Sequence, residues 1–269
     1  ITSNDITVVE GYLYLGYMYT IVGPGSTATS TSSTDYIGSA NYYWNQTHDV
    51  DANMEPEAKS KLFTPIGSLY DANGGEDGKN AAAADAYMSF FSGSYNGNTY
   101  SIKNIEINSG NIALGLFGSI IGANVHDLIL YSDKGNYIQR TSNVKTWYVM
   151  GGLCGLAAVS KDNESGSVSI TNCTVSGYTI KDNSTKSAWG DACVGGMFGM
   201  STLDLKKCTA VNDIVLNTVY TGDTGTKDDG VAIRTGGLVG SMRGRIKNCY
   251  TGGKITITPE CRANAGYGY

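Results

Sequence analysis

The chain has 269 residues, 36 of them glycine and only 4 proline, and charged residues make up 16% of the total. A formal net charge of −5 leaves no basic surface of the kind that binds nucleic acid, so we expect no nucleic-acid partner. No apolar run approaches the roughly 20 residues that a helix needs to cross a bilayer, so no membrane span is expected in this segment. Because the chain begins at Ile1 and carries no signal peptide, we interpret it as a processed product or an excised fragment.

Residues 1–40 are predicted to form an N-terminal β-rich cap and linker. Ile6–Val9 and Tyr12–Val22 are β-rich, and residues 23–33 are a Ser/Thr/Gly tract typical of a flexible connection. The β-rich part is interpreted as strands that cover an open end of the fold. Two alternatives are pairing with another subunit and stacking of its tyrosine row on sugar.

An insertion zone is expected over residues 53–92. Met54–Lys61 and Asn80–Met88 favour two short helices. Asp71–Gly78 and the pattern Asp49-x-Asp51-x-Asn53 are rich in oxygen ligands, which makes each a candidate calcium site. Both lack the remaining ligands of a calcium loop, and Asp, Asn and Gly are ordinary turn residues. We therefore predict no metal, no cofactor and no catalytic residue.

From residue 93 onward one phrase recurs. A Gly-apolar-apolar-Gly run is followed by apolar-polar-Asn-apolar, with nearly constant spacing. The clearest copies are Gly115–Leu128, Gly152–Cys173, Gly196–Cys208 and Gly237–Cys249, and a degenerate first copy runs from Gly93 to Ile105. Alternation with period two predicts short strands, and repeats that tolerate loop insertions predict a solenoid. The sequence thus predicts an all-β protein, a parallel β-helix.

Stacked copies would place equivalent side chains in columns. One interior column would hold Ile105, Leu128, Cys173, Cys208 and Cys249. A second would hold Ile102, Val125, Ile170, Leu205 and Ile246. A turn ladder would consist of Asn104, Asp127, Asn172, Lys207 and Asn248, since Asn and Asp tolerate left-handed backbone. The six cysteines are expected to be mostly buried thiols, with one disulfide between neighbouring coils left open as an alternative.

These phrases resemble the GLUG repeat of bacterial cell-surface proteins. Gly-Leu-Phe-Gly, Gly-Gly-Leu-Val-Gly and Ile-Lys-Asn-Cys-Tyr-Thr-Gly-Gly-Lys-Ile carry the resemblance, which covers roughly residues 41–258. Such repeats are found in adhesin-like proteins and in non-catalytic regions of secreted immunoglobulin A1 proteases. The resemblance implies a right-handed β-helix over 41–269, displayed outside a cell, and it carries over no catalytic residue.

Several polar loops are predicted to leave the edges of this scaffold. They are 132–147, 160–166, 181–191 and 220–234. Two alternatives apply to the large side chains in or beside these loops: they form a glycan-binding platform, or they pack the loops onto the scaffold. These residues are Tyr131, Tyr137, Arg140, Trp147, Tyr148, Trp189 and Tyr220. Acidic residues of these loops are interpreted as solvated: Asp162, Glu164, Asp182, Asp191, Asp228 and Asp229.

The only histidines, His48 and His126, lie in no nucleophile or metal motif, and we interpret His126 as an outward surface residue. The chain is therefore predicted to be a non-enzymatic extracellular surface protein. Its loops would attach to a host or environmental glycan or protein. One alternative is a subunit that self-associates end to end into a filament or layer, and another is a β-helical polysaccharide lyase or hydrolase.

Overall fold

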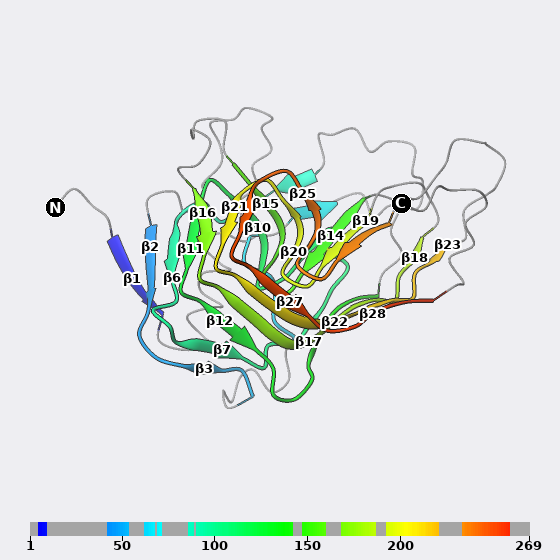
Figure 1. Cartoon of the computed structure of the whole chain (residues 1–269), viewed down its shortest axis with the longest axis horizontal. Helices are drawn as coiled ribbons and strands as arrows, with labels where there is room; N and C mark the ends of the chain where they lie inside the picture. Colours follow the sequence, from blue (N-terminus) through cyan, green and yellow to red (C-terminus); the bar gives the residue numbers. More distant parts are fainter. Residues whose placement is uncertain are drawn as a thin grey trace.

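The computed structural model describes residues 5–9, 42–53, 62–67, 69–71, 86–88, 90–141, 147–159, 168–186, 192–220 and 233–258. These residues form an all-β fold in which nearly all strand pairs are parallel, and they contain no helix. The chain passes through four sheets in a fixed order, here named A, B, C and D, and then returns to sheet A (Figure 1). Each passage is called a circuit below, and from β6 onward each complete circuit adds one layer of strands to every sheet.

Sheet A contains, in spatial order, β1 (Asp5–Val9), β2 (Tyr42–Gln46), β6 (Ser94–Asn96), β11 (Asn124–His126), β16 (Ser169–Thr171), β21 (Asp204–Lys206) and β26 (Ile246–Lys247). The main path of sheet B contains β3 (Val50–Asp51), β7 (Ser101–Lys103), β12 (Ile129–Tyr131), β17 (Thr174–Asp182), β22 (Thr209–Leu216) and β27 (Tyr250–Gly252). Sheet B also includes β8 (Ile107–Asn108), β13 (Tyr137–Arg140) and β28 (Ile255–Ile257).

Sheet C contains β9 (Ala113–Leu114), β14 (Tyr148–Gly151), β19 (Ala192–Gly195) and β24 (Ile233–Gly236). Sheet D contains β10 (Phe117–Ile121), β15 (Cys154–Ala158), β20 (Phe198–Ser201) and β25 (Val239–Met242). Two small pairs remain: parallel β18 (Thr185–Lys186) with β23 (Val219–Tyr220), and antiparallel β4 (Leu69–Asp71) with β5 (Ala86–Met88).

The strand register stacks inward side chains into files through the core. In sheet A one file runs through Trp44, Tyr95, Val125, Ile170, Leu205 and Ile246. Leu128, Cys173, Cys208 and Cys249 occupy equivalent corner positions between paired strands of sheets A and B, as the sequence predicts. The predicted places of Ile102 and Ile105 in these files are wrong. Ile102 pairs with Leu130 in sheet B, and Tyr95 fills the position expected for Ile102.

The corner between sheets A and B requires left-handed backbone. Asp127, Asn172, Lys207 and Asn248 all have φ between 53° and 56° there, as expected for the turn ladder. One rung is directly bonded, because Asn172 Nδ2 donates to Asp127 Oδ1 over 2.5 Å. Asn104 also has positive φ, at 60°, but it lies after β7, at the far end of a sheet B strand. The circuit that contains β6 and β7 instead turns this corner at Asn98 and Thr99.

The recurring glycines mark close contacts between sheets C and D. A Cβ atom on Gly199 of β20 would lie 2.5 Å from the backbone nitrogen of Met150 in β14. One on Gly155 of β15 would lie 2.7 Å from the backbone nitrogen of Leu114 in β9. Both distances are too short for a real side chain, so the second glycine of each phrase lets the two strands approach.

One expectation for the first 92 residues is wrong, and one expected strand is present. Ala86–Met88 forms β5 and not the end of a helix, because it pairs antiparallel with Leu69–Asp71. β1 adds a parallel strand beside β2 at one end of sheet A. Residues 12–33, the helix expected over 54–61 and the calcium loop beyond Asp71 lie outside the described residues. In the described part of the chain no helix has the length and apolar character to cross a membrane.

Candidate functional site

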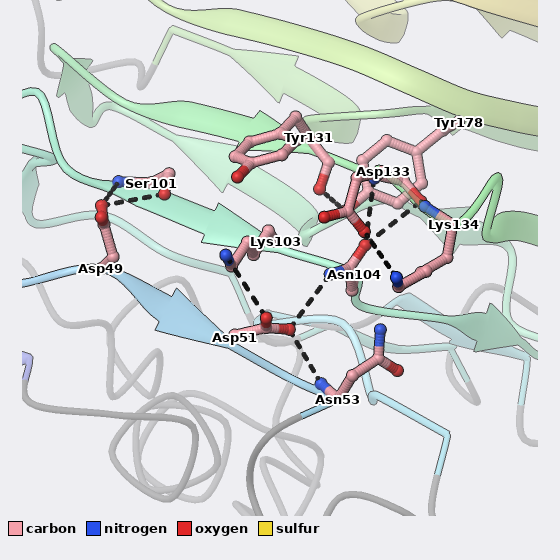
Figure 2. A network of polar contacts seen from close by, with 11 residues as sticks. Asp49, Asp51, Asn53, Ser101, Lys103, Asn104, Tyr131, Asp133, Lys134 and Tyr178 are labelled. Atoms are coloured by element: carbon pink, nitrogen blue, oxygen red, sulfur yellow. Dashed lines mark hydrogen bonds and ion pairs between the residues drawn. The ribbon is translucent and has the colours of Figure 1, made fainter.

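The first candidate site is the carboxylate pair of Asp49 and Asp51, which the sequence suggested for calcium. Asp49 Oδ1 accepts hydrogen bonds from the Ser101 backbone nitrogen at 2.7 Å and from Ser101 Oγ at 2.9 Å. Asp51 Oδ1 accepts from Asn53 N and from Asn104 Nδ2, both at 3.1 Å, and Lys103 Nζ lies 3.4 Å from Asp51 Oδ2. Figure 2 shows the two carboxylates directed at different partners on neighbouring strands, so they do not converge on one point.

These contacts favour the ionised acids. Hydrogen bonds from the Ser101 backbone and hydroxyl hold the pKa of Asp49 below its ordinary value. Burial alone would raise the pKa of Asp51, but hydrogen bonds from Asn104 and Asn53, together with the Lys103 ammonium, outweigh burial and lower it. Both acids therefore act as fixed anions. Asp49 joins the loop after β2 to β7, and Asp51 joins β3 to β7.

The same network continues upward to the next circuit. Asn104 Oδ1 accepts from the backbone nitrogen of Asp133 at 3.1 Å, and Tyr178 donates its hydroxyl proton to the Tyr131 carbonyl at 3.0 Å (Figure 2). The described residues contain no group of three or more His, Cys, Asp or Glu side chains that could hold a metal ion. The arrangement ties together four successive strands of sheet B, β3, β7, β12 and β17, and its described residues form no converging set of oxygen ligands.

The second candidate site is a buried polar cluster at the corner between sheets B and C. Arg140 ends β13 and is only 2% exposed, and its guanidinium lies 4.9 Å from the centre of the Tyr148 ring. Its Nη1 donates to the Asn111 carbonyl, and its Nη2 donates to the Gly110 carbonyl at 2.9 Å. Arg140 also pairs in register with Asp182, which places one buried cation near one buried anion.

Asp182 is the acceptor at the centre of this cluster. Its Oδ2 accepts hydrogen bonds from the hydroxyls of Tyr148 and Thr218, and its Oδ1 accepts from the Ser184 backbone nitrogen at 2.9 Å. The expectation that Asp182 is a solvated loop acid is wrong, because β17 runs through residue 182 and directs this side chain inward. Arg140 is likewise part of a strand and not of a loop.

Electrostatics fix the protonation of Tyr148 and Arg140 at neutral pH. Burial, reinforced by the Asp182 charge, raises the pKa of Tyr148 well above its ordinary value, so the phenol keeps its proton and donates it. Burial lowers the pKa of Arg140 to about 10, against the opposing effects of Asp182 and Tyr148, so the guanidinium stays charged. Tyr148 is therefore no general base, and the acid is held by donors from three circuits.

Three connections of different length begin and end directly beside this cluster. They join β13 to β14, β18 to β19 and β23 to β24, and each leads from the sheet B side of its circuit into sheet C. Tyr148, Ala192 and Ile233, which begin the strands after the connections, stand in one register line. Residues 142–146, 187–191 and 221–232, including Trp189, Asp191, Asp228 and Asp229, lie outside the described residues, as do Asp162 and Glu164 of the 160–167 segment.

The aromatic side chains considered for glycan binding do not share one environment. Tyr148 is fully buried, whereas Trp147 beside it is 40% exposed, and Tyr131 and Tyr137 are half-buried. The Tyr137 hydroxyl bonds to Glu106, which raises its pKa. For Tyr148 the alternative of packing against the scaffold is therefore correct, and Trp147 is the most exposed aromatic at this corner among the described residues.

The stacked cysteines Cys173, Cys208 and Cys249 repeat one contact, in which each sulfur lies near a backbone carbonyl of the preceding circuit. Cys173 Sγ lies 3.6 Å from the Val125 carbonyl, and Cys208 Sγ lies 3.6 Å from the Ile170 carbonyl. Cys249 Sγ accepts a hydrogen bond from the Cys208 backbone nitrogen at 3.4 Å. Cys154, Cys173, Cys193 and Cys208 are buried as predicted, Cys249 is half-buried, and Cys261 lies outside the described residues. Burial raises the pKa of the Cys173 thiol.

His126 points outward, as predicted, and its Nδ1 lies 2.7 Å from Asp127 Oδ2. His48 is exposed near Thr47 Oγ1. Neither histidine contributes to the buried cluster.

The buried cluster was the main feature missed from the sequence. A signal for it was present, since Tyr178, Ile180 and Asp182 alternate with outward residues, as do Ile138 and Arg140. A charged residue at an inward position of a strand needs a buried partner. In comparisons with known proteins, no protein-family model, curated protein or solved structure matches the chain.

Proposed function

We propose that the chain is a right-handed parallel β-helix of the GLUG type that works outside the cell as a non-enzymatic attachment module. Three connections of unequal length at one corner of a regular scaffold carry this proposal. Loops on a rigid scaffold are where binding specificity concentrates, because they vary without disturbing the core. A β-helix is supported by the four-sheet circuit and by the files of inward residues.

The buried cluster supports this role. Asp182 receives hydrogen bonds from residues of three successive circuits, at the position where the connections begin and end. Its hydrogen-bond donors are neutral hydroxyl and backbone groups, and the two charged side chains of the cluster, Arg140 and Asp182, are both buried. A corner fixed in this way would hold the connections at a constant spacing, which lets several of them contact one glycan or protein together.

The composition of the chain also fits attachment outside a cell. Charged residues make up only 16% of the chain, and tyrosine is abundant at 19 residues. Tyrosine supplies large contact area at low conformational cost, which suits binding to glycan or protein.

The test is binding of the purified full chain to a glycan array and to intact cells. In one variant residues 222–231 are replaced by a short Gly-Ser linker. In its matched control residues 161–166, which connect sheet D to sheet A, are replaced in the same way. Binding that is lost in the first variant and kept in the control supports the proposal.

Equal loss of binding in both variants, or no binding by the wild-type chain, would contradict it. Release of shortened oligosaccharides from any polysaccharide tested would favour the lyase or hydrolase alternative. Antibody labelling of intact cells that express the full-length protein tests the location separately.

A further inference from the structure

The last described strands expose side chains that occupy the interior in every earlier circuit. Leu205 and Ile214 are fully buried, yet their partners in the next circuit, Ile246 and Ile255, are 51% and 42% exposed. Ile257, which pairs with the buried Leu216, is 53% exposed. The face formed by β25, β26, β27 and β28, called the terminal face below, is therefore a cross-section through the apolar core.

The backbone of the terminal face is also open. Each of its four strands has a described neighbour on one side only. Parallel strands are usually buried and paired on both sides, and an open edge invites another strand. Both the apolar side chains and the strand edge match a further circuit of the same architecture.

Charge identifies which surface can cover this face. Residues 233–258 contain five basic residues, Arg234, Arg243, Arg245, Lys247 and Lys254, and no Asp or Glu. Arg245 already forms an ion pair with Asp204 of the preceding circuit, so the attraction relies on the other basic residues. The first 53 residues contain five acidic residues, Asp5, Glu10, Asp35, Asp49 and Asp51, and no Lys or Arg. The two ends of the sequence thus carry opposite charge within a chain whose net charge is −5.

Of these acidic residues, β1 places Asp5 at the opposite end of sheet A, and Asp51 lies in β3, the outermost strand of sheet B at the same end. In sheet A the order runs from β1 to β26, so these two strands are the outermost members of one parallel sheet. Figure 1 shows β1 at one edge of this sheet, beside β2. A second copy that continues the sheet in the same direction would bring its β1 beside β26. The basic residues would repel another terminal face and attract this acidic end.

We infer that the terminal face binds the N-terminal end of a second copy of this chain, head to tail. Such a contact joins two different surfaces and does not close on itself, so it generates a filament. The inference does not depend on the attachment function, since it concerns a different face of the molecule.

The test is sedimentation velocity and light scattering of the purified full chain over a range of concentrations, at about 20 mM and about 500 mM salt. The average mass is expected to rise with concentration beyond two chains, and to rise less at high salt because screening weakens the attraction. Lys247 and Lys254 are exposed, so the double variant Lys247→Glu/Lys254→Glu should fold and associate more weakly by on the order of tenfold or more.

Two further variants make the result specific. Lys134→Glu/Lys181→Glu changes the net charge equally but away from the terminal face, and it should associate like the wild type. Ile255→Asp/Ile257→Asp should block association without altering the positive charges. Adding Asp5→Lys chains to Lys247→Glu/Lys254→Glu chains should restore association between the two.

A wild-type chain that stays monomeric at low salt and high concentration would overturn the inference. So would assembly that stops at two chains, which indicates a symmetric contact, or equal weakening by both lysine pairs, which indicates a general charge effect.

Discussion

Asp182 shows how a single inward carboxylate organises its surroundings at the residue scale. Replacing it by Asn leaves one acceptor oxygen for three donors, the Tyr148 and Thr218 hydroxyls and the Ser184 backbone nitrogen, and it leaves Arg140 without its nearby anion. Breaking a buried charged network in this way costs about 3–5 kcal/mol. We expect Asp182→Asn to lower the free energy of unfolding by about that amount, measured by urea denaturation.

The control is Asp133→Asn. Asp133 is exposed and 3.9 Å from Lys134, so its loss should change stability by less than about 1 kcal/mol. If the two variants are equally stable, Asp182 is not the centre of a buried network.

A pH dependence follows from the acids with lowered pKa values. Hydrogen bonds from Ser101 lower the pKa of Asp49, and the ion pair with Arg245 lowers that of Asp204. Asp51 is also lowered, by Asn104, Asn53 and Lys103 acting against burial. An acid whose pKa is lowered on folding stabilises the fold above its unfolded pKa of about 4, and this stabilisation is lost as pH falls through the folded value.

The melting temperature is therefore expected to be insensitive to these acids above about pH 5 and to fall below about pH 4. Asp51→Asn should melt lower than the wild type at neutral pH, and the difference should shrink in acid. Melting curves followed by circular dichroism across this pH range check it, and a difference that grows in acid would contradict it.

At the scale of elements, the corner between sheets A and B offers a position where one residue fits poorly. Lys207 adopts φ of 53° where other circuits carry Asp or Asn, and left-handed backbone costs most residues about 1–2 kcal/mol. We expect Lys207→Asn to stabilise the protein by about 0.5–1 kcal/mol in urea denaturation. Lys206→Asn, one residue earlier on a regular strand, should be neutral or destabilising. Equal effects of the two variants would show that φ is not the cause.

The contact between sheets C and D makes a second prediction at this scale. Gly199→Ala places a Cβ atom 2.5 Å from the Met150 backbone nitrogen, so strands β14 and β20 must separate. We expect destabilisation of about 1–3 kcal/mol, measured as the free energy of unfolding. In the control Gly252→Ala, the nearest atom lies at 3.4 Å and belongs to the Tyr250 side chain, so stability should barely change. Similar losses in both variants would exclude the close strand contact as the cause.

The elements also show what the sequence could predict and where it failed. Period-two alternation and the Gly phrases correctly predicted short parallel strands and the file from Leu128 to Cys249. The first copy was misaligned because Ile102-Lys103-Asn104-Ile105 resembles the later phrases but ends a sheet B strand, where Asn104 also turns with positive φ. Both corners of the circuit require a residue with positive φ, so the local sequence does not distinguish them. Only the pairing of Tyr95 with Val125 shows that Tyr95, and not Ile102, occupies this position in the sheet A file.

The candidate sites were harder to predict for a related reason. The polar residues around Asp182 and Arg140 in the sequence favour loops. Their hydrogen-bond partners come from parts of the chain tens of residues away, so the local sequence does not reveal them. Such long-range pairing has no local signature apart from a charge at an inward position of a strand. The carboxylates Asp49 and Asp51 were recognised, but their partners Ser101 and Lys103 were not.

At the scale of the whole molecule, sheets that grow by one strand per circuit have two ends and no natural limit. The interior is complete only where a circuit lies between two others, so the same side-chain position changes its energetic role along the stack. Leu205 is enclosed by Ile170 on one side and Ile246 on the other, whereas Ile246 has a described neighbour on one side only.

This difference gives a direct measure of where the core ends. Leu205→Ala should cost about 2–5 kcal/mol of unfolding free energy, because it leaves a cavity inside the stack. Ile246 is 51% exposed, so Ile246→Ala removes less buried surface, leaves no enclosed cavity and should cost less than about 1.5 kcal/mol in dilute protein. If head-to-tail association covers Ile246, its cost should increase as protein concentration rises, whereas that of Leu205→Ala should stay constant. Equal costs for both variants in dilute solution would mean that the core extends past Ile246 within a single chain.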